Sequence, residues 1–172
     1  MKQIASLFLI YLLLFVMLVC SSCGISKEEP LTPFTELDFN NTVGDMLEIY
    51  GETQEIKVNE DGYTEYFYPY EYEGRTGQLR FSVNSQNKIE QISWLYEPLT
   101  ADEVTTCAEE WENLFIETYG EPDFTNDAGK MWYTKLATIG VVKASVLSIN
   151  IVWIIYTNPE IKNAETMSQF AE

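Results

Sequence analysis

Residues 46–53 read Met-Leu-Glu-Ile-Tyr-Gly-Glu-Thr, and residues 115–122 repeat the pattern as Phe-Ile-Glu-Thr-Tyr-Gly-Glu-Pro. Each stretch ends an apolar-periodic segment with Tyr-Gly-Glu, and an Asn/Asp/Gly turn and aromatic, β-prone sequence follow it. Glycine adopts the left-handed conformation that ends many helices. The echo therefore predicts two copies of one unit, in which a helix precedes strands.

Both expected helices carry a start signal and an apolar stripe. Thr42 precedes Asp45 by three residues, and Thr100 precedes Glu103 by three, so each pair can cap a helix start. Cys107 lies on the second stripe, which indicates a buried small hydrophobe rather than a nucleophile. The stripes follow helical spacing: Val43, Met46, Leu47 and Tyr50, then Val104, Cys107, Ala108, Trp111, Phe115 and Tyr119.

Strand-like stretches follow each helix and are joined by short turns, which is typical of an antiparallel meander. Pro69 cannot donate to a sheet, so its strand is expected at an edge or with a bulge. Residues 74–77 are expected to form a loop. The last apolar stretch, 141–156, fits either one long strand or a hairpin that turns near residues 148–150. The expected strands are 63–73, 78–84, 89–96, 130–136 and 141–156.

Tyrosines alternate along the first strand, so their side chains share one face. Two interpretations remain open for this row. It packs on the helix of its own unit, or it forms an exposed aromatic platform for a protein or glycan. The candidate partner-binding residues are the row and three tryptophans: Tyr66, Tyr68, Tyr70, Tyr72, Trp94, Trp132 and Trp153.

The predicted fold class is α+β, with two tandem units that each consist of a helix followed by an antiparallel meander. The helices are expected to pack on one face of the sheet. The predicted segments are a signal peptide (1–22), a lipidated tether (23–35), a first unit (36–98), a second unit (99–157) and a C-terminal tail (158–172).

The N-terminus has the layout of an export signal. Residues 4–19 are almost entirely apolar, which is short for a membrane-spanning helix and sufficient for a signal-peptide core. Ser21 and Ser22 directly precede Cys23, and this arrangement resembles a bacterial lipoprotein signal. The resemblance implies cleavage before Cys23, acylation of that residue and a lipid anchor in a membrane of the bacterial cell envelope.

The twice-repeated order of helix, glycine, turn and aromatic meander behind an export signal resembles the β-lactamase-inhibitor-protein-like fold. The small outer-membrane assembly lipoproteins of the SmpA/OmlA type are similar single-unit relatives. The resemblance covers residues 36–157. It implies two helix-and-sheet units side by side, with an aromatic-rich concave surface that binds proteins.

Composition excludes several kinds of chemistry. The formal net charge of −17 repels nucleic acid and favours a neutral or basic protein partner. The sequence contains no histidine, which removes the commonest general base and zinc ligand. Cys107 is the one cysteine after Cys23, so no disulfide can form within residues 24–172. No cofactor and no metal site are expected.

The sequence therefore predicts a non-catalytic, membrane-anchored module that binds a protein. One alternative is a histidine-independent hydrolase of envelope glycans or peptides, which would use paired carboxylates. The candidate pairs are Glu60 with Asp61 and Asp123 with Asp127, all in turn sequences where acids are common. A second alternative is an envelope assembly or structural lipoprotein.

Overall fold

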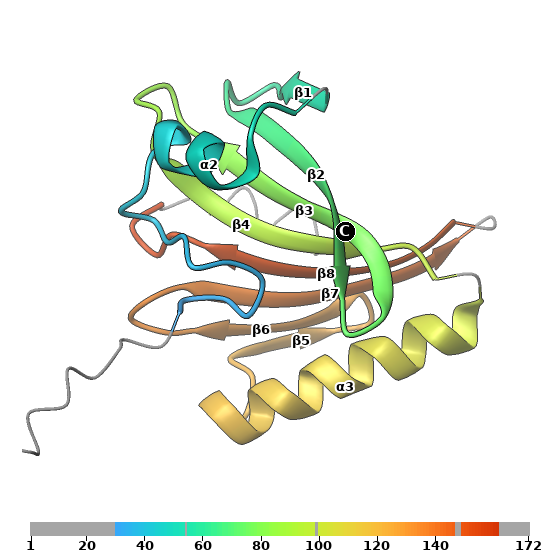
Figure 1. Cartoon of the computed structure of the whole chain (residues 1–172). Helices are drawn as coiled ribbons and strands as arrows, with labels where there is room; N and C mark the ends of the chain where they lie inside the picture. Colours follow the sequence, from blue (N-terminus) through green and yellow to red (C-terminus); the bar gives the residue numbers. More distant parts are fainter. Residues whose placement is uncertain (1–29, 54, 99, 147–148, 162–172) are drawn as a thin grey trace, which may run out of the picture.

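The computed structural model describes residues 30–53, 55–98, 100–146 and 149–161. These residues form two helices and one eight-stranded antiparallel sheet (Figure 1). The helices are α2 (Val43–Tyr50) and α3 (Ala101–Tyr119). The strands are β1 (Glu55–Val58), β2 (Thr64–Tyr72), β3 (Arg75–Val83), β4 (Ile89–Tyr96), β5 (Phe124–Asn126), β6 (Gly129–Tyr133), β7 (Thr138–Val146) and β8 (Ile149–Thr157).

The sheet is continuous, with strand order β1-β2-β3-β4-β8-β7-β6-β5. At its centre β4 pairs with β8, from Gln91 opposite Thr157 to Tyr96 opposite Val152. The predicted fold class, two tandem helix-and-meander units with helices packed on one face, is therefore wrong. Both β4 and β8 carry buried residues on both faces, and such strands are most stable in the interior of a sheet. Their pairing therefore joins the strands of the two expected units into one sheet.

The two helices occupy different places (Figure 1). The long helix α3 packs against β7 and β8. The two-turn helix α2 lies near the β3–β4 turn, where the Val43 backbone N–H donates to the Asn87 carbonyl over 3.1 Å. We call the sheet face that contacts these helices the inner face. One row across it consists of Tyr68, Leu79, Trp94, Ile154 and Val141.

The helix ends agree with the sequence-based expectation. The Thr42–Asp45 and Thr100–Glu103 pairs each form a capping box, in which the threonine hydroxyl accepts from the acid's backbone N–H and the acid accepts from the threonine's. Gly51 (φ 73°) ends α2, and Gly120 (φ 88°) ends α3. Positive φ values favour glycine at both sites.

The strands differ from the prediction mainly at their ends. The expected loop at residues 74–77 is shorter, because the turn is made by Glu73 and Gly74, both with positive φ, and β3 already begins at Arg75. Strand β1 covers β2 only from Thr64 to Phe67, so Pro69 lies at a local sheet edge, as expected. The stretch 141–156 belongs to the β7–β8 hairpin. Strands β1 and β5 were not predicted.

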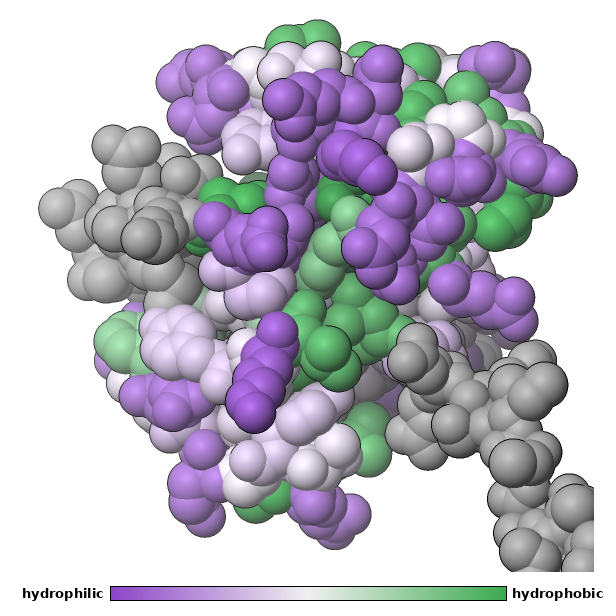
Figure 2. All heavy atoms as spheres, turned by 90° about the vertical axis from the view of Figure 1, so that its left-hand side faces the viewer, coloured by the Kyte–Doolittle hydropathy of each residue, from purple (hydrophilic) through white to green (hydrophobic). Residues whose placement is uncertain are grey.

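The N-terminal residues 31–35, which the prediction places in the tether, belong to the folded body. Phe34 is 2% exposed. Its ring lies 5.1 Å from Tyr72, 5.8 Å from Trp94, 5.5 Å from Trp111 and 6.3 Å from Tyr156, measured between centroids. The segment therefore joins the sheet and α3 in one aromatic core. Seen from the left-hand side of Figure 1, hydrophobic groups gather at mid-height between hydrophilic ones (Figure 2).

Candidate functional site on the outer face of the sheet

The tyrosine row lies on the inner face and packs into the core. Tyr68 is 7% exposed, its ring lies 5.2 Å from that of Tyr50 on α2, and its hydroxyl donates to the Gly51 carbonyl over 2.9 Å. Burial raises the pKa of the Tyr68 hydroxyl. The other three residues are partly buried against the same core: Tyr66, Tyr70 and Tyr72. The row thus matches the packing interpretation.

Two of the three predicted tryptophans also lie in the core. Trp94 is 0% exposed and stacks on Tyr96 with a centroid distance of 5.6 Å. Trp132 is 1% exposed, and its indole N–H donates to the Gly120 carbonyl over 2.9 Å, which ties β6 to the end of α3. In the folded protein these side chains stabilise the interior and have almost no surface for a partner.

Trp153 lies apart from the other predicted residues, on the outer face of the sheet. It is half-buried and stands opposite Leu95 on β4 and Val142 on β7. The Arg80 guanidinium carbon lies 5.8 Å from the centroid of the Trp153 ring system and 5.0 Å from that of Phe67, both within cation–π range. The structure therefore brings Trp153, which the sequence predicted, together with Phe67 and Arg80, which it did not.

The Arg80 side chain is fixed by a further contact. Its Nε and Nη2 donate to the Gln78 Oε1 over 3.2 and 3.0 Å. Ser93 lies beside Arg80 on β4 and opposite Ile155 on β8, and its small side chain leaves room for the guanidinium to approach Trp153 across β4. The guanidinium is thus preorganised between two rings. We call Phe67, Arg80 and Trp153 the outer cluster. Phe67 is 3% exposed and supports the guanidinium from below, so the surface open to a partner is that of Arg80 and Trp153.

Acidic residues surround the outer cluster. Burial lowers the pKa of Arg80, and Glu65, Glu55 and Glu97 oppose this shift by favouring the charged guanidinium. The Lys57 Nζ lies 4.7 Å from the Phe67 centroid and 2.8 Å from a Glu55 oxygen. The site therefore combines aromatic rings and a held cation with a carboxylate rim.

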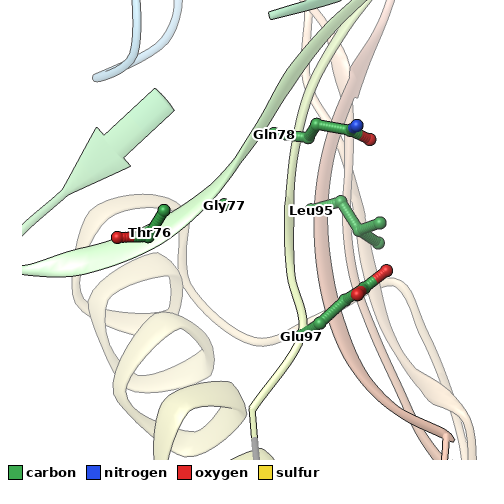
Figure 3. Close-up of a pocket in the computed structure, with 5 residues that line it drawn as sticks. All are labelled: Thr76, Gly77, Gln78, Leu95 and Glu97. Atoms are coloured by element: carbon green, nitrogen blue, oxygen red, sulfur yellow. The ribbon is translucent and has the colours of Figure 1, made fainter. Parts of the chain in front are cut away.

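A hollow of about 210 Å³ lies beside this cluster, lined by Thr76, Gly77, Gln78, Leu95 and Glu97. Gln78, Leu95 and Glu97 point to the same side of the sheet, away from α3 (Figure 3). A Cβ on Gly77 would collide with the Leu95 carbonyl and with the Trp94 indole nitrogen, so glycine permits the close approach of β3 and β4. The walls offer an amide, a carboxylate and an apolar surface.

The carboxylate pairs of the hydrolase alternative lie elsewhere. Glu60, Asp61, Asp123 and Asp127 are all exposed. Asp123 uses one carboxylate oxygen to accept from the Tyr133 backbone N–H over 2.7 Å, which is a structural role. A catalytic acid that works near neutral pH usually needs burial or a like charge to raise its pKa. No described feature places these pairs in such a site.

A buried carboxylate on α3 has a structural explanation. Glu112 has a side chain that is 6% exposed, and its oxygens lie 2.8 Å from the Lys130 Nζ and 3.3 Å from the Lys143 Nζ. Burying a carboxylate requires paired charges. The two lysines come from β6 and β7, so the cluster fixes α3 over that part of the sheet.

No family model, curated protein or solved structure matches this chain. Within residues 30–161, gaps excepted, no group of three or more acidic or cysteine side chains could hold a metal ion. Neither α2 nor α3 is long and apolar enough to span a membrane, and this finding covers only the part of the chain that the structure describes. Cys23 and the expected signal and tail segments lie outside the described residues, apart from residues 158–161.

Only the kind of residue pointed to Trp153. Strand β8 is apolar at successive positions, so the sequence does not show which of its side chains lie on the outer face of the sheet. Phe67 carried a stronger signal, because it interrupts the charged side of β2. Arg80 carried none of its own, because it occupies a regular polar position between Leu79 and Phe81. An aromatic residue on the polar side of a strand marks a place where that face is built around a ring.

Proposed function

We propose that this chain is a membrane-anchored extracytoplasmic lipoprotein that binds a protein partner through the outer face of its sheet, without catalysis. The observation that carries the proposal is the outer cluster, in which Arg80 is held between Phe67 and Trp153 on the face away from α2 and α3. Tryptophan and arginine are, with tyrosine, enriched among the residues that dominate binding energy at protein interfaces.

The charge distribution supports a neutral or basic partner. Glu55, Glu65 and Glu97 flank the cluster, and the whole chain has a formal net charge of −17. Complementary charge speeds encounter and selects the partner. The hollow beside the cluster, with Gln78 and Glu97 in its wall, fits a small side chain with an N–H donor.

The anchor half of the proposal rests on the sequence. Acylation at Cys23 would place the folded body close to a bilayer, because the seven residues 24–30 span at most roughly 25 Å when extended. Metabolic labelling with a fatty-acid probe tests it. We expect label in the wild type and none in Cys23→Ala, and label that persists in Cys23→Ala would overturn the assignment.

The binding half is tested by affinity capture with the full chain in detergent. We expect saturable recovery of one protein by the wild type, and at least a tenfold loss with Trp153→Ala and with Arg80→Gln. Leu136→Ala is the control, because Leu136 is a large apolar residue that is 72% exposed on the turn between β6 and β7, away from the outer cluster. Equal recovery by wild type and Trp153→Ala, with unchanged thermal unfolding, would contradict the proposal.

A further inference from the structure

The edge strand β1 is open. It is the last strand of the sheet and pairs only with β2 among the described strands (Figure 1). All four of its residues are exposed, including Ile56 at 48% and Val58 at 71%. Exposed edge strands present unpaired backbone groups that can template another strand. Large β-branched residues are well suited to such pairing.

The pairing with β2 determines which backbone groups of β1 are free. In an antiparallel pair, residues that bond to the neighbouring strand alternate with residues whose N–H and C=O point away. The Asn59 N–H donates to the Tyr63 carbonyl over 3.0 Å, so Asn59 belongs to the bonding set. Counting back in twos places Lys57 and Glu55 in the same bonding set, so Ile56 and Val58 direct their N–H and C=O groups to the open edge.

The charges on β1 distinguish the ways in which two copies of this strand could meet. In antiparallel self-pairing the outward-directed groups must face each other. Centring the pair on Ile56 places Glu55 opposite Lys57 of the second copy, twice. Centring it on Glu55 or on Lys57 places like charges opposite each other, which is destabilising. Centring it on Val58 runs each strand into the turn at residues 59–62.

We propose that β1 pairs antiparallel with β1 of a second copy of this chain, with Ile56 at the two-fold axis. Each Ile56 N–H then donates to the Ile56 carbonyl of the other copy, the two Ile56 side chains meet on one face, and the Glu55–Lys57 pairs meet on the other. The same residues already form an ion pair within one copy, with a nitrogen–oxygen distance of 2.8 Å. The four-residue strand makes the association weak, and the pairing uses Glu55 and Lys57, which also border the outer cluster.

Disulfide trapping in the full chain tests this register. Residues opposite each other in a hydrogen-bonded antiparallel pair have Cα atoms about 5.5 Å apart, within disulfide range. We expect Ile56→Cys to give a disulfide-linked homodimer under mild oxidation at about 0.15 M salt, with the bridge at position 56 identified by mass spectrometry. The unaltered chain, with Cys20, Cys23 and Cys107, sets the background.

Val58→Cys is the matched control. Val58 is also exposed and directs its backbone to the same edge, but its copy lies about 13 Å away along the strands in the proposed register, too far for a disulfide. If Ile56→Cys dimerises no more than Val58→Cys, the proposal is refuted. A disulfide from position 56 to a different protein would refute the choice of a second copy.

Charge reversal supplies an independent arm. In the Ile56→Cys background, Glu55→Lys and Lys57→Glu should each lower the dimer yield about tenfold, because like charges then face each other in both pairs. The double reversal restores opposite charges and should restore the yield. Failure of the double reversal to do so, with all variants equally folded by circular dichroism, would refute the register.

Discussion

Phe34 is predicted to be a structural residue of the core rather than part of a flexible tether. Its ring is 2% exposed and lies within 6.3 Å of four other aromatic rings, from β2, β4, α3 and β8. The neighbouring backbone is also fixed, because the Phe34 N–H donates to the Thr32 hydroxyl over 3.2 Å. Phe34→Ala removes the ring and keeps the backbone.

The expected cost is about 4 kcal/mol of unfolding free energy. A phenylalanine buries at least about 150 Å² of mostly apolar surface, which corresponds to about 4 kcal/mol at 25 cal/mol per Å². Large-to-small substitutions of buried phenylalanine cost about 3–5 kcal/mol in general. The four ring neighbours come from separate elements, so we expect the cavity to collapse only in part.

Equilibrium urea unfolding, followed by tryptophan fluorescence, measures this cost. Leu136→Ala is the control, because Leu136 is 72% exposed and should change the free energy by less than about 0.5 kcal/mol. If Phe34→Ala leaves too little folded protein, Phe34→Leu should still cost about 1–1.5 kcal/mol. A loss below about 0.5 kcal/mol in Phe34→Ala would show that residues 31–35 are a tether, and the reasoning would be refuted.

Three further predictions concern single contacts. Glu112→Gln should lower the free energy of unfolding in urea by about 2 kcal/mol, because Lys130 and Lys143, whose side chains are 26% and 29% exposed, lose their charged partner. A loss under about 0.5 kcal/mol would contradict this. Tyr68→Phe should cost about 1 kcal/mol in thermal unfolding, because the Gly51 carbonyl loses a donor; an unchanged melting temperature would count against the bond. Burial raises the pKa of the Cys107 thiol from 9.0 to about 11, so the unfolded thiol ionises first and stability falls as pH rises between these values. Cys107→Ala should reduce that fall in a pH series of urea curves, and an identical pH profile would exclude the thiol as its cause.

The helices were predictable because their signals are local. The Thr-x-x-acid spacing and the glycine that follows Tyr50 and Tyr119 act within a few residues of each helix end, and the structure has both features where the sequence places them. The burial of Cys107 followed from the same helical period. Such patterns depend on backbone geometry alone.

The joining of the sheet was not predictable from local pattern. The β4–β8 pairing brings together residues such as Ile92 and Tyr156, which are far apart in the sequence. An apolar run on β8 indicates that both faces are covered but does not identify the neighbouring strand. The same run hides the direction of Trp153, because Val152 and Ile154 beside it are equally apolar. Strand β1 alternates charged and apolar residues, but four residues give a weak signal.

Site-specific photocrosslinking in living cells tests the binding surface most directly. A photoreactive p-benzoylphenylalanine at Thr76, an exposed residue in the wall of the hollow, should form a covalent adduct with one protein, and the adduct should be lost when Trp153→Ala is added. The same probe at Leu136, which is exposed on a distant turn, should give no such adduct. Adducts of equal yield at both positions, or an adduct at Thr76 that persists in Trp153→Ala, would contradict binding through the outer face of the sheet.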